Sequence, residues 1–390
     1  MSDAFDVIVI GGGPAGYPAA IRAAQNRLTV ACIDEWKNKD GSATFGGTCL
    51  NAGCIPSKAL LESSELLHRA QAEFAAHGIR TGAVSIDVAA MQKRKAGIVK
   101  GMTGGIQQLL KAAGVTALQG HGRLMPGRQV EFTAHDGSRR TLSAKHVILA
   151  SGSAPMELRS VPFDGRQVLD SWGALELDAV PQRLGVIGAG VIGLELGSVW
   201  KRLGAQVVVL EALPEFLAIA DQQLAKEALK QFRKQGLDIR LGAKVSGARA
   251  GDDGVSVEYT DAGGAAQSVS VDRLIVCIGR RPYTRDLLGI GTGVELDERG
   301  FIKVDHDCRT GAENVWAVGD CVRGAAFGAE HRAERIGPPS HHGRSELARR
   351  RLPCAQRSPD QGPRRCAHGV TSGEPLRARR ARTHRGSAPA

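Results

Sequence analysis

Apolar residues form the same pattern twice along this chain. Residues 5–10 read FDVIVI, the glycine turn GGGPAG follows, residues 19–27 have helical composition, and LTVACID forms a second apolar run over residues 28–34. Short β-branched runs predict buried strands, and the segment between them predicts a helix that joins two parallel strands. Residues 183–211 repeat the pattern, from RLGVI through a glycine turn to QVVVLE. The pattern therefore predicts two α/β units of one design.

The two turns have glycines in the spacing G-x-G-x-x-G. The first glycine permits a tight turn, the second lets the backbone approach a pyrophosphate, and the third lets helix and strand pack closely. The N-terminus of the helix then offers N–H groups and partial positive charge to the phosphates. Two such turns predict two dinucleotide sites, and one bound flavin with one exchanging nicotinamide is the most economical interpretation. The alternative is an internal duplication with one inactive copy. The glycines concerned are Gly11, Gly13 and Gly16 in the first turn and Gly188, Gly190 and Gly193 in the second.

An acidic residue ends the second strand of each unit. Asp34 and Glu211 each follow the last glycine of their turn by 18 residues. A carboxylate at this place can accept hydrogen bonds from ribose hydroxyls. Because a carboxylate also repels a 2′-phosphate, the second unit is expected to prefer NAD to NADP.

Two cysteines lie in the segment GGTCLNAGCIPSK, residues 46–58. A zinc site needs about four ligands, and no second Cys/His pair lies nearby in the sequence. A structural disulfide is not expected in a reducing compartment. Cys49 and Cys54 are predicted to begin a helix, whose N-terminal field favours thiolate. Lys58, one helical turn after Cys54, is predicted to be a buried cation, with an exposed lysine as the alternative. Redox chemistry is the preferred hypothesis for the pair.

Three later apolar runs also end in turns of small residues. Residues 145–155 lead to the turn at Ser151, Gly152 and Ser153, residues 272–284 lead to Gly279, and residues 309–322 lead to Asp320. Such turns let the backbone approach a cofactor. Asp320 is predicted to accept hydrogen bonds from the ribityl hydroxyls of a flavin, and a solvated surface acid is the alternative.

Composition narrows the class of protein. The chain has 390 residues, of which 42% are hydrophobic. No apolar run approaches the ~20 residues that span a bilayer, so no membrane association is expected. The N-terminus lacks the basic start of a signal peptide, so a cytoplasmic location is expected. Most of the net charge of +11 lies in residues 325–390, which contain 14 arginines, no lysine and five acidic residues.

The motifs together resemble those of the class I pyridine nucleotide–disulfide oxidoreductases, and within that family they are most similar to the dihydrolipoamide dehydrogenases. They are GGTCLNAGCIPSK, both glycine turns, ASGS, GRRPYT and AVGD, from about residue 5 to about residue 323. The resemblance implies an α/β fold with two Rossmann-like domains. The FAD-binding domain would comprise residues 1–150 and 279–324, and the NAD-binding domain, inserted in it, residues 151–278.

The resemblance also implies an activity and partners. The chain would oxidise protein-bound dihydrolipoamide with NAD, through a redox disulfide and FAD. Its partner would be the lipoyl domain of the acyltransferase of a 2-oxo acid dehydrogenase complex, and the family forms homodimers. A related NAD(P)H-dependent disulfide or mercuric reductase is the alternative enzyme, and an inactive dinucleotide-binding remnant is the alternative without activity.

Roles for individual residues follow from the same resemblance. Cys49 and Cys54 would form the redox disulfide, with Cys49 exchanging with the dithiol and Cys54 lying against the flavin as the charge-transfer thiolate. Lys58 would lie near the flavin N5 and pair with Glu195. No metal site is predicted. The expected cofactor-binding residues are Gly11, Gly13, Gly16, Asp34, Gly46, Gly47, Thr48, Lys58, Gly122, Ser151, Gly152, Ser153 and Asp320 for FAD, and Gly188, Gly190, Gly193, Glu195, Glu211, Val245 and Gly279 for NAD.

Residues 325–390 depart from the family pattern. The family continues after AVGD with an interface domain that makes the homodimer and supplies a His-Pro step, whereas no histidine of this chain is followed by proline. Our hypothesis is a frameshift near residue 324, which sequence of the downstream DNA in the other frames would test. Residues 325–390 are then expected to be disordered, and the acid–base histidine and the dimer interface to be missing. A basic arm that binds nucleic acid is the alternative, which the scarcity of aromatic residues disfavours.

Overall fold

The computed structural model describes residues 3–323, so the expectations for residues 325–390 lie outside the described residues. The first sheet forms around the first predicted unit. β1 pairs in parallel with both β2 and β5, and α1 connects β1 to β2. The central strands are buried, as expected for parallel strands covered on both faces. The elements of this sheet are β1 (Ala4–Ile10), α1 (Gly16–Gln25), β2 (Val30–Asp34), β3 (Thr116–Met125), β4 (Gln129–Ala134), β5 (Arg139–Leu149) and β16 (Val315–Ala317).

The second sheet forms around the repeat of the pattern. Its five strands lie in the order β10-β9-β8-β14-β7, and every neighbouring pair is parallel. The elements are β7 (Val168–Leu169), α5 (Ser171–Ala174), β8 (Arg183–Ile187), α6 (Val191–Arg202), β9 (Gln206–Glu211), α7 (Gln222–Lys234), β10 (Asp238–Leu241) and β14 (Arg273–Val276). An antiparallel sheet follows β10 and consists of β11 (Lys244–Gly251), β12 (Gly254–Thr260) and β13 (Ala266–Val271).

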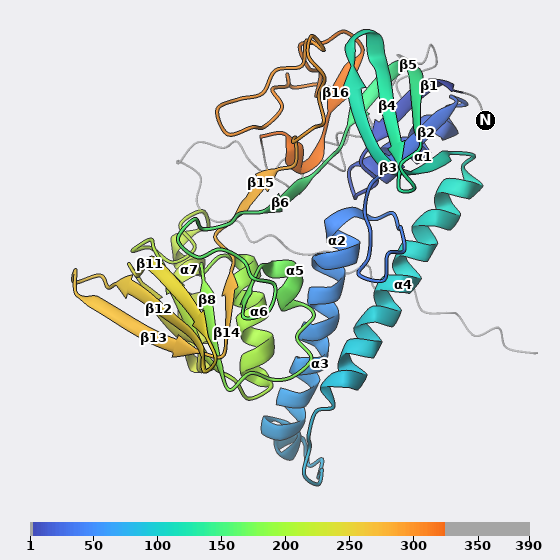
Figure 1. The fold of residues 1–390 in the computed structure, drawn as a ribbon. Helices are drawn as coiled ribbons and strands as arrows, with labels where there is room; N and C mark the ends of the chain where they lie inside the picture. The colour runs from blue at the N-terminus through green and yellow to red at the C-terminus, as the bar shows by residue number, and fades with distance from the viewer. Residues whose placement is uncertain (1–2, 324–390) are drawn as a thin grey trace, which may run out of the picture. The chain divides into compact units, whose positions relative to one another are not determined.

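The chain passes between the two large sheets twice. β6 (Ser153–Pro155) leaves the first sheet after β5, and β15 (Arg280–Pro282) returns after β14. The two crossings pair with each other as an antiparallel ribbon, which Figure 1 shows between the sheets. The second unit is therefore an insertion within the first, and the structure confirms the predicted α/β fold class.

A long helical pair lies between β2 and β3 in the sequence. It is formed by α2 (Gly47–Ala52), α3 (Cys54–Ala72) and α4 (Val88–Ala112), and α3 and α4 run side by side in Figure 1. Leu60 of α3 and Met91 of α4 belong to the apolar core of the second sheet, whereas Ile106 and Leu110 of α4 belong to that of the first. The helix α4 thus contributes to both cores. Short 3₁₀ turns are η1 (Phe74–His77), η2 (Pro126–Arg128) and η3 (Gly319–Cys321).

Within residues 3–323, no helix combines the length and the hydrophobicity that crossing a bilayer requires.

Candidate active site

The first glycine turn leaves no room for side chains at two of its glycines. Gly11 has a φ of 109°, and a Cβ on it would lie 2.1 Å from the Ala150 carbonyl oxygen. A Cβ on Gly16 would lie 1.7 Å from the Gly11 carbonyl oxygen. These contacts bring β1, the turn and α1 as close together as the motif requires.

The acidic residue at the end of β2 binds the backbone of the first glycine turn. Asp34 Oδ2 accepts a hydrogen bond from the Gly12 N–H at 2.7 Å, and Oδ1 accepts one from the Trp36 N–H at 2.9 Å. The side chain is almost fully buried, and this burial raises the pKa of Asp34 to about 6. Because a carboxylate has about four lone-pair sites, Asp34 keeps acceptor capacity for a ribose hydroxyl.

The second turn repeats this geometry. Gly188 has a φ of 103°, and a Cβ on it would lie 2.4 Å from the Cys277 carbonyl oxygen. Glu211 Oε2 accepts from the Ala189 N–H at 2.7 Å, and Oε1 accepts from the Leu213 N–H at 2.9 Å. Nothing lies within 4 Å of a Cβ on Gly190. The second turn therefore has open space where the motif places a pyrophosphate.

The two cysteines lie on either side of a break between two helices, so the prediction that they begin one continuous helix was wrong. Cys49 lies in α2, and Cys54 is the first residue of α3. Gly53 between them has φ −148° and ψ −114°, and a Cβ there would lie 2.9 Å from the Thr48 carbonyl oxygen. Across this break the two thiols interact through a hydrogen bond.

The cysteine pair has asymmetric electrostatics. Both residues are free thiols in this structure. The hydrogen bond from the Cys49 thiol, assisted by the Lys58 ammonium, lowers the pKa of Cys54 to about 6. The same hydrogen bond, together with burial, raises the pKa of Cys49. At neutral pH the pair is therefore a thiolate at Cys54 beside a thiol at Cys49.

An ion pair joins the cysteine helix to the helix of the second turn. Lys58 Nζ donates to Glu195 Oε1 on α6 at 2.6 Å. The Lys58 side chain is 59% exposed, so the expected buried cation is instead a largely exposed one. The other carboxylate oxygen, Glu195 Oε2, accepts from the hydroxyl of Ser57 at 3.1 Å. Ser57 was not among the predicted site residues, because a serine in a helix carries no signal of a partner 138 residues away.

Arg280 is a further site residue that the sequence analysis missed. Its Nε donates to Ser153 Oγ at 2.8 Å, and its Nη2 donates to the Ser153 carbonyl oxygen at 2.6 Å and to Thr48 Oγ1 at 3.4 Å. Ser153 Oγ in turn donates to Asp320 Oδ2 at 2.7 Å. Burial lowers the pKa of Arg280. The motif GRRP places two arginines here, and the sequence gives no ground for choosing between them.

Comparisons with known proteins agree with this geometry. The sequence profile of the family described as "Pyridine nucleotide-disulphide oxidoreductase" matches residues 5–350. The dihydrolipoyl dehydrogenase of Cupriavidus necator is 51% identical over 339 residues, covering 86% of this chain and 71% of that protein. Dihydrolipoyl dehydrogenase 3 of Pseudomonas putida is 46% identical over 85% of this chain and 69% of its own length.

A solved structure has the same fold. The HOCl-induced flavoprotein disulfide reductase RclA from Escherichia coli superposes with a TM-score of 0.70 at 26% sequence identity, over 84% of this chain and 69% of that one. This chain belongs to the pyridine nucleotide-disulphide oxidoreductase family. It is a flavoprotein disulfide oxidoreductase, and the family uses FAD and NAD.

The helix N-termini at the two turns differ in what they offer to a dinucleotide of this family. The helices that begin at the turns, α1 and α6, have no side-chain cap at their N-termini. In contrast, α4 and α7 are capped by Asp87 and Asp221. At α6, which has no side-chain cap, the first N–H groups lack partners within the helix and are available to phosphate. At α1 the Gly16 and Tyr17 N–H groups already donate to the Gly13 carbonyl oxygen, at 2.8 and 3.0 Å. The helix N-terminus therefore suits a pyrophosphate at the second turn.

The remaining predicted residues lie in three different places. Gly46 and Gly47 lie against the first turn, where Gly46 N–H donates to the Gly12 carbonyl oxygen at 2.9 Å and a Cβ on Gly47 would lie 2.7 Å from Gly13 Cα. The turn after β5, with Ser151 and Gly152, meets the turn of Gly279 through the β6–β15 ribbon.

Two predicted residues lie in sheets rather than in turns. Gly122 lies in β3, and a Cβ on it would press on Ile33 and Ile10, so core packing already accounts for this glycine. Val245 is partly buried in β11 against the core of the second unit.

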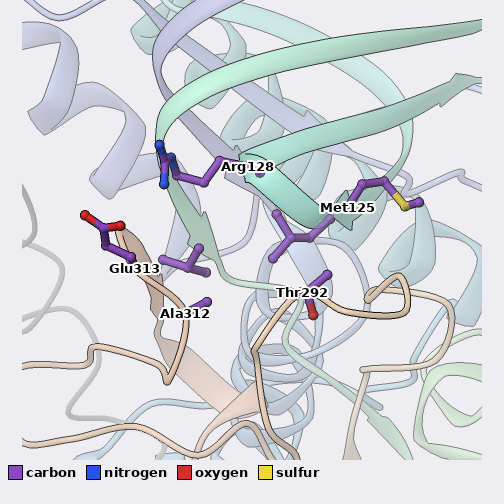
Figure 2. A pocket seen from close by; sticks show the side chains of 8 residues that line it. Met125, Arg128, Thr292, Ala312 and Glu313 are labelled. Carbon is purple, nitrogen blue, oxygen red and sulfur yellow. The ribbon is translucent and has the colours of Figure 1, made fainter.

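A small cavity of about 120 Å³ lies outside this constellation. Figure 2 shows its lining by Met125, Arg128, Thr292, Ala312 and Glu313, from the end of β3, from η2 and from the segment between β15 and β16. None of these is a predicted site residue. Within the described residues, no cluster of His, Cys, Asp or Glu side chains is arranged to hold a metal ion.

Proposed function

We propose that the chain oxidises dihydrolipoamide with NAD, using Cys49 and Cys54 as the redox pair. The observation that carries this proposal is the thiol–thiolate pair at the break between α2 and α3, joined through Lys58 and Glu195 to the helix of the second turn. The names of the curated relatives, dihydrolipoyl dehydrogenases, support the choice of dithiol.

The cysteines carry the dithiol half of the reaction. With Cys49 and Cys54 joined as a disulfide, a thiolate of dihydrolipoamide attacks Cys49 Sγ, and Cys54 leaves as a thiolate. The second substrate thiolate then displaces Cys49, which leaves lipoamide oxidised and the cysteine pair reduced by two electrons. The low pKa of Cys54 suits it as the leaving sulfur.

Other residues orient the redox centre. FAD, when bound, would supply the two-electron carrier between the cysteine pair and NAD. The first turn with Asp34, and the network of Arg280, Ser153 and Asp320, would hold the flavin. The second turn with Glu211 would hold NAD. The ammonium of Lys58 and the carboxylate of Glu195 would place a pair of opposite charges between the flavin site and the NAD site.

We also propose the domain bounds and partners given by the family resemblance. The two large sheets, the first mixed and the second parallel, support an FAD-binding domain of residues 1–150 and 279–324 and an inserted NAD-binding domain of residues 151–278. The proposed partner is a lipoyl domain of a 2-oxo acid dehydrogenase complex, the proposed assembly is a homodimer, and the proposed location is the cytoplasm. The names of the bacterial relatives support this context.

Steady-state kinetics of the purified chain test the function. NAD reduction by dihydrolipoamide and dye reduction by NADH are measured side by side, for the unaltered chain and for Cys49→Ser. We expect Cys49→Ser to abolish the first reaction and to retain the second, because only the first passes through the sulfurs. Turnover of dihydrolipoamide by Cys49→Ser at the rate of the unaltered chain would contradict the proposal.

A further inference from the structure

The first turn of α3 presents three polar groups on one face. Cys54, Ser57 and Lys58 have the spacing i, i+3 and i+4, which places their side chains side by side on a helix. The helix α6 packs against α3, as Figure 1 shows, and brings Glu195 to this face. Each oxygen of the Glu195 carboxylate has its own donor: Lys58 Nζ at 2.6 Å and Ser57 Oγ at 3.1 Å.

The two donors differ in burial. The Lys58 side chain is 59% exposed, whereas Ser57 is only 7% exposed. An exposed ion pair is weak by itself, because solvent screens it and holding two long side chains costs entropy. A buried donor on the second oxygen removes the rotational freedom of the carboxylate. In the cluster of Ser57, Lys58 and Glu195, Ser57 is therefore the residue that fixes the position of the carboxylate.

We propose that Ser57 is a positioning residue, whose hydroxyl fixes the Glu195 carboxylate and thereby holds the Lys58 ammonium between the cysteine pair and the second glycine turn. This proposal rests on the proposed function, because it assigns the cluster to the transfer between NAD and the redox centre, a step that dye reduction by NADH also uses. Nothing in the family resemblance assigns a role to this serine.

The hydroxyl also links the carboxylate to the backbone of the redox cysteine. Ser57 Oγ lies 3.2 Å from the Cys54 carbonyl oxygen, and a hydroxyl has one hydrogen to donate. The ionised carboxylate is the stronger acceptor, so the hydrogen points to Glu195 while that group is charged. A shift of α6 relative to α3 would return it to Cys54.

The same helix offers a matched control. Ser64 is fully buried, and its hydroxyl donates to the Leu61 carbonyl oxygen at 2.9 Å. Ser64→Ala and Ser57→Ala both remove one buried hydroxyl from α3, and alanine favours the helix in both cases. Of the two, only Ser57 has a hydrogen bond to Glu195.

A double-mutant cycle on the flavin-loaded full chain tests the contact without reference to activity. The variants are Ser57→Ala, Glu195→Ala and their combination, with Ser64→Ala and its combination with Glu195→Ala as the control cycle. The measurement is the midpoint of urea unfolding. We expect the Ser57 and Glu195 shifts to be non-additive and the Ser64 and Glu195 shifts to add. Additive shifts for Ser57 and Glu195 would overturn the proposal, whatever the enzyme turns over.

Kinetics separate positioning from a purely structural role. In dye reduction by NADH, we expect Ser57→Ala to lower kcat roughly tenfold with KM nearly unchanged, because misplaced groups slow the transfer rather than binding. Ser57→Thr keeps a hydroxyl and should restore most of kcat, and Ser64→Ala should keep all of it. Equal losses for Ser57→Ala and Ser64→Ala would overturn the positioning role. The two proposals can fail separately. If the chain does not oxidise dihydrolipoamide, the proposed substrate is wrong. If the double-mutant cycle is then still non-additive and Ser57→Ala still slows dye reduction, the positioning role of Ser57 stands.

Discussion

The two glycine turns have the same hydrogen bonds but different surroundings. In each, the acid that ends the second strand accepts from the N–H after the first glycine and from the N–H two residues beyond the acid. The first turn is covered: Gly47 lies against Gly13, and a Cβ on Gly12 would lie 2.4 Å from Phe45 Cδ1. The second turn is open: nothing lies near a Cβ on Gly190.

The difference shows how one design can serve two kinds of cofactor. The segment that covers the first turn is the segment that leads into the cysteine pair, and Asp34 beside this turn is almost fully buried. Around the second turn Val191 and Leu213 are 61% and 53% exposed. A covered turn suits a dinucleotide that stays bound, and an open turn suits one that must leave after each turnover.

The largest expected effect comes from filling the covered turn. Gly12→Ala would place a Cβ 2.4 Å from Phe45 Cδ1 and 2.6 Å from Asp34 Oδ2, and overpacking of this kind costs about 1–3 kcal/mol. We expect a lower free energy of unfolding and less flavin in the purified protein. The matched control is Ala189→Gly, at the same place in the second turn, which should cost less than about 1 kcal/mol. Equal costs at the two turns would remove the contrast between them.

Neutralising the acidic residue should change coenzyme selectivity at the second turn but not at the first. Glu211→Gln removes the charge that repels a 2′-phosphate, so we expect the ratio of kcat/KM for NAD over NADP to fall about tenfold, or ~1.4 kcal/mol. Asp34→Asn is the control and should leave this ratio unchanged, because it alters the other turn. The ratio is measured from initial rates with each coenzyme. A shift of the ratio by Asp34→Asn would show that the sites are wrongly assigned.

A smaller effect is expected at the joint between the two units. Lys95 of α4 is 3% exposed, and its Nζ donates to the Leu175 carbonyl oxygen at 2.7 Å and to Glu176 of the second unit. Lys95→Met keeps the aliphatic stem and loses these hydrogen bonds, so the free energy of unfolding should fall by about 1 kcal/mol. Lys93→Met, exposed on the same helix, is the control. Separate unfolding transitions in Lys95→Met would show that this joint couples the units.

The smallest effect concerns the pH dependence of the reduced cysteine pair. The pKa of Cys54 is lowered from 9.0 to about 6, so the thiolate stabilises the folded state fully above pH 9. This contribution is lost as the pH falls through about 6. We expect the ultraviolet absorption of the thiolate to titrate near pH 6 and to move to higher pH in Cys49→Ala, which removes the main cause of the shift. A midpoint that Cys49→Ala leaves unchanged would contradict this account.

Local patterns predicted the parts of the site that depend on nearby residues. Gly11 and Gly188 have the positive φ that their turns require, because a glycine turn between strand and helix permits few other conformations. The break at Gly53 was missed, although Gly53 and Pro56 are residues typical of a helix boundary. Arg280 and Ser57 were missed because their partners, Ser153 and Glu195, lie more than a hundred residues away.

The sequence by itself therefore determined the two units, their glycine turns, the acids that close them and the cysteine pair. Each of these depends on hydrophobic periodicity or on fixed spacing within about 35 residues, which local sterics translate directly into backbone geometry. Only the tertiary structure decided that one turn is covered and the other open, that Lys58 is exposed, and that Ser57 meets Glu195. Those outcomes depend on which distant segments pack together. The packing of α3 against α6, and of residues 45–47 over the first turn, does not produce a hydrophobic periodicity in the sequence from which it could be predicted.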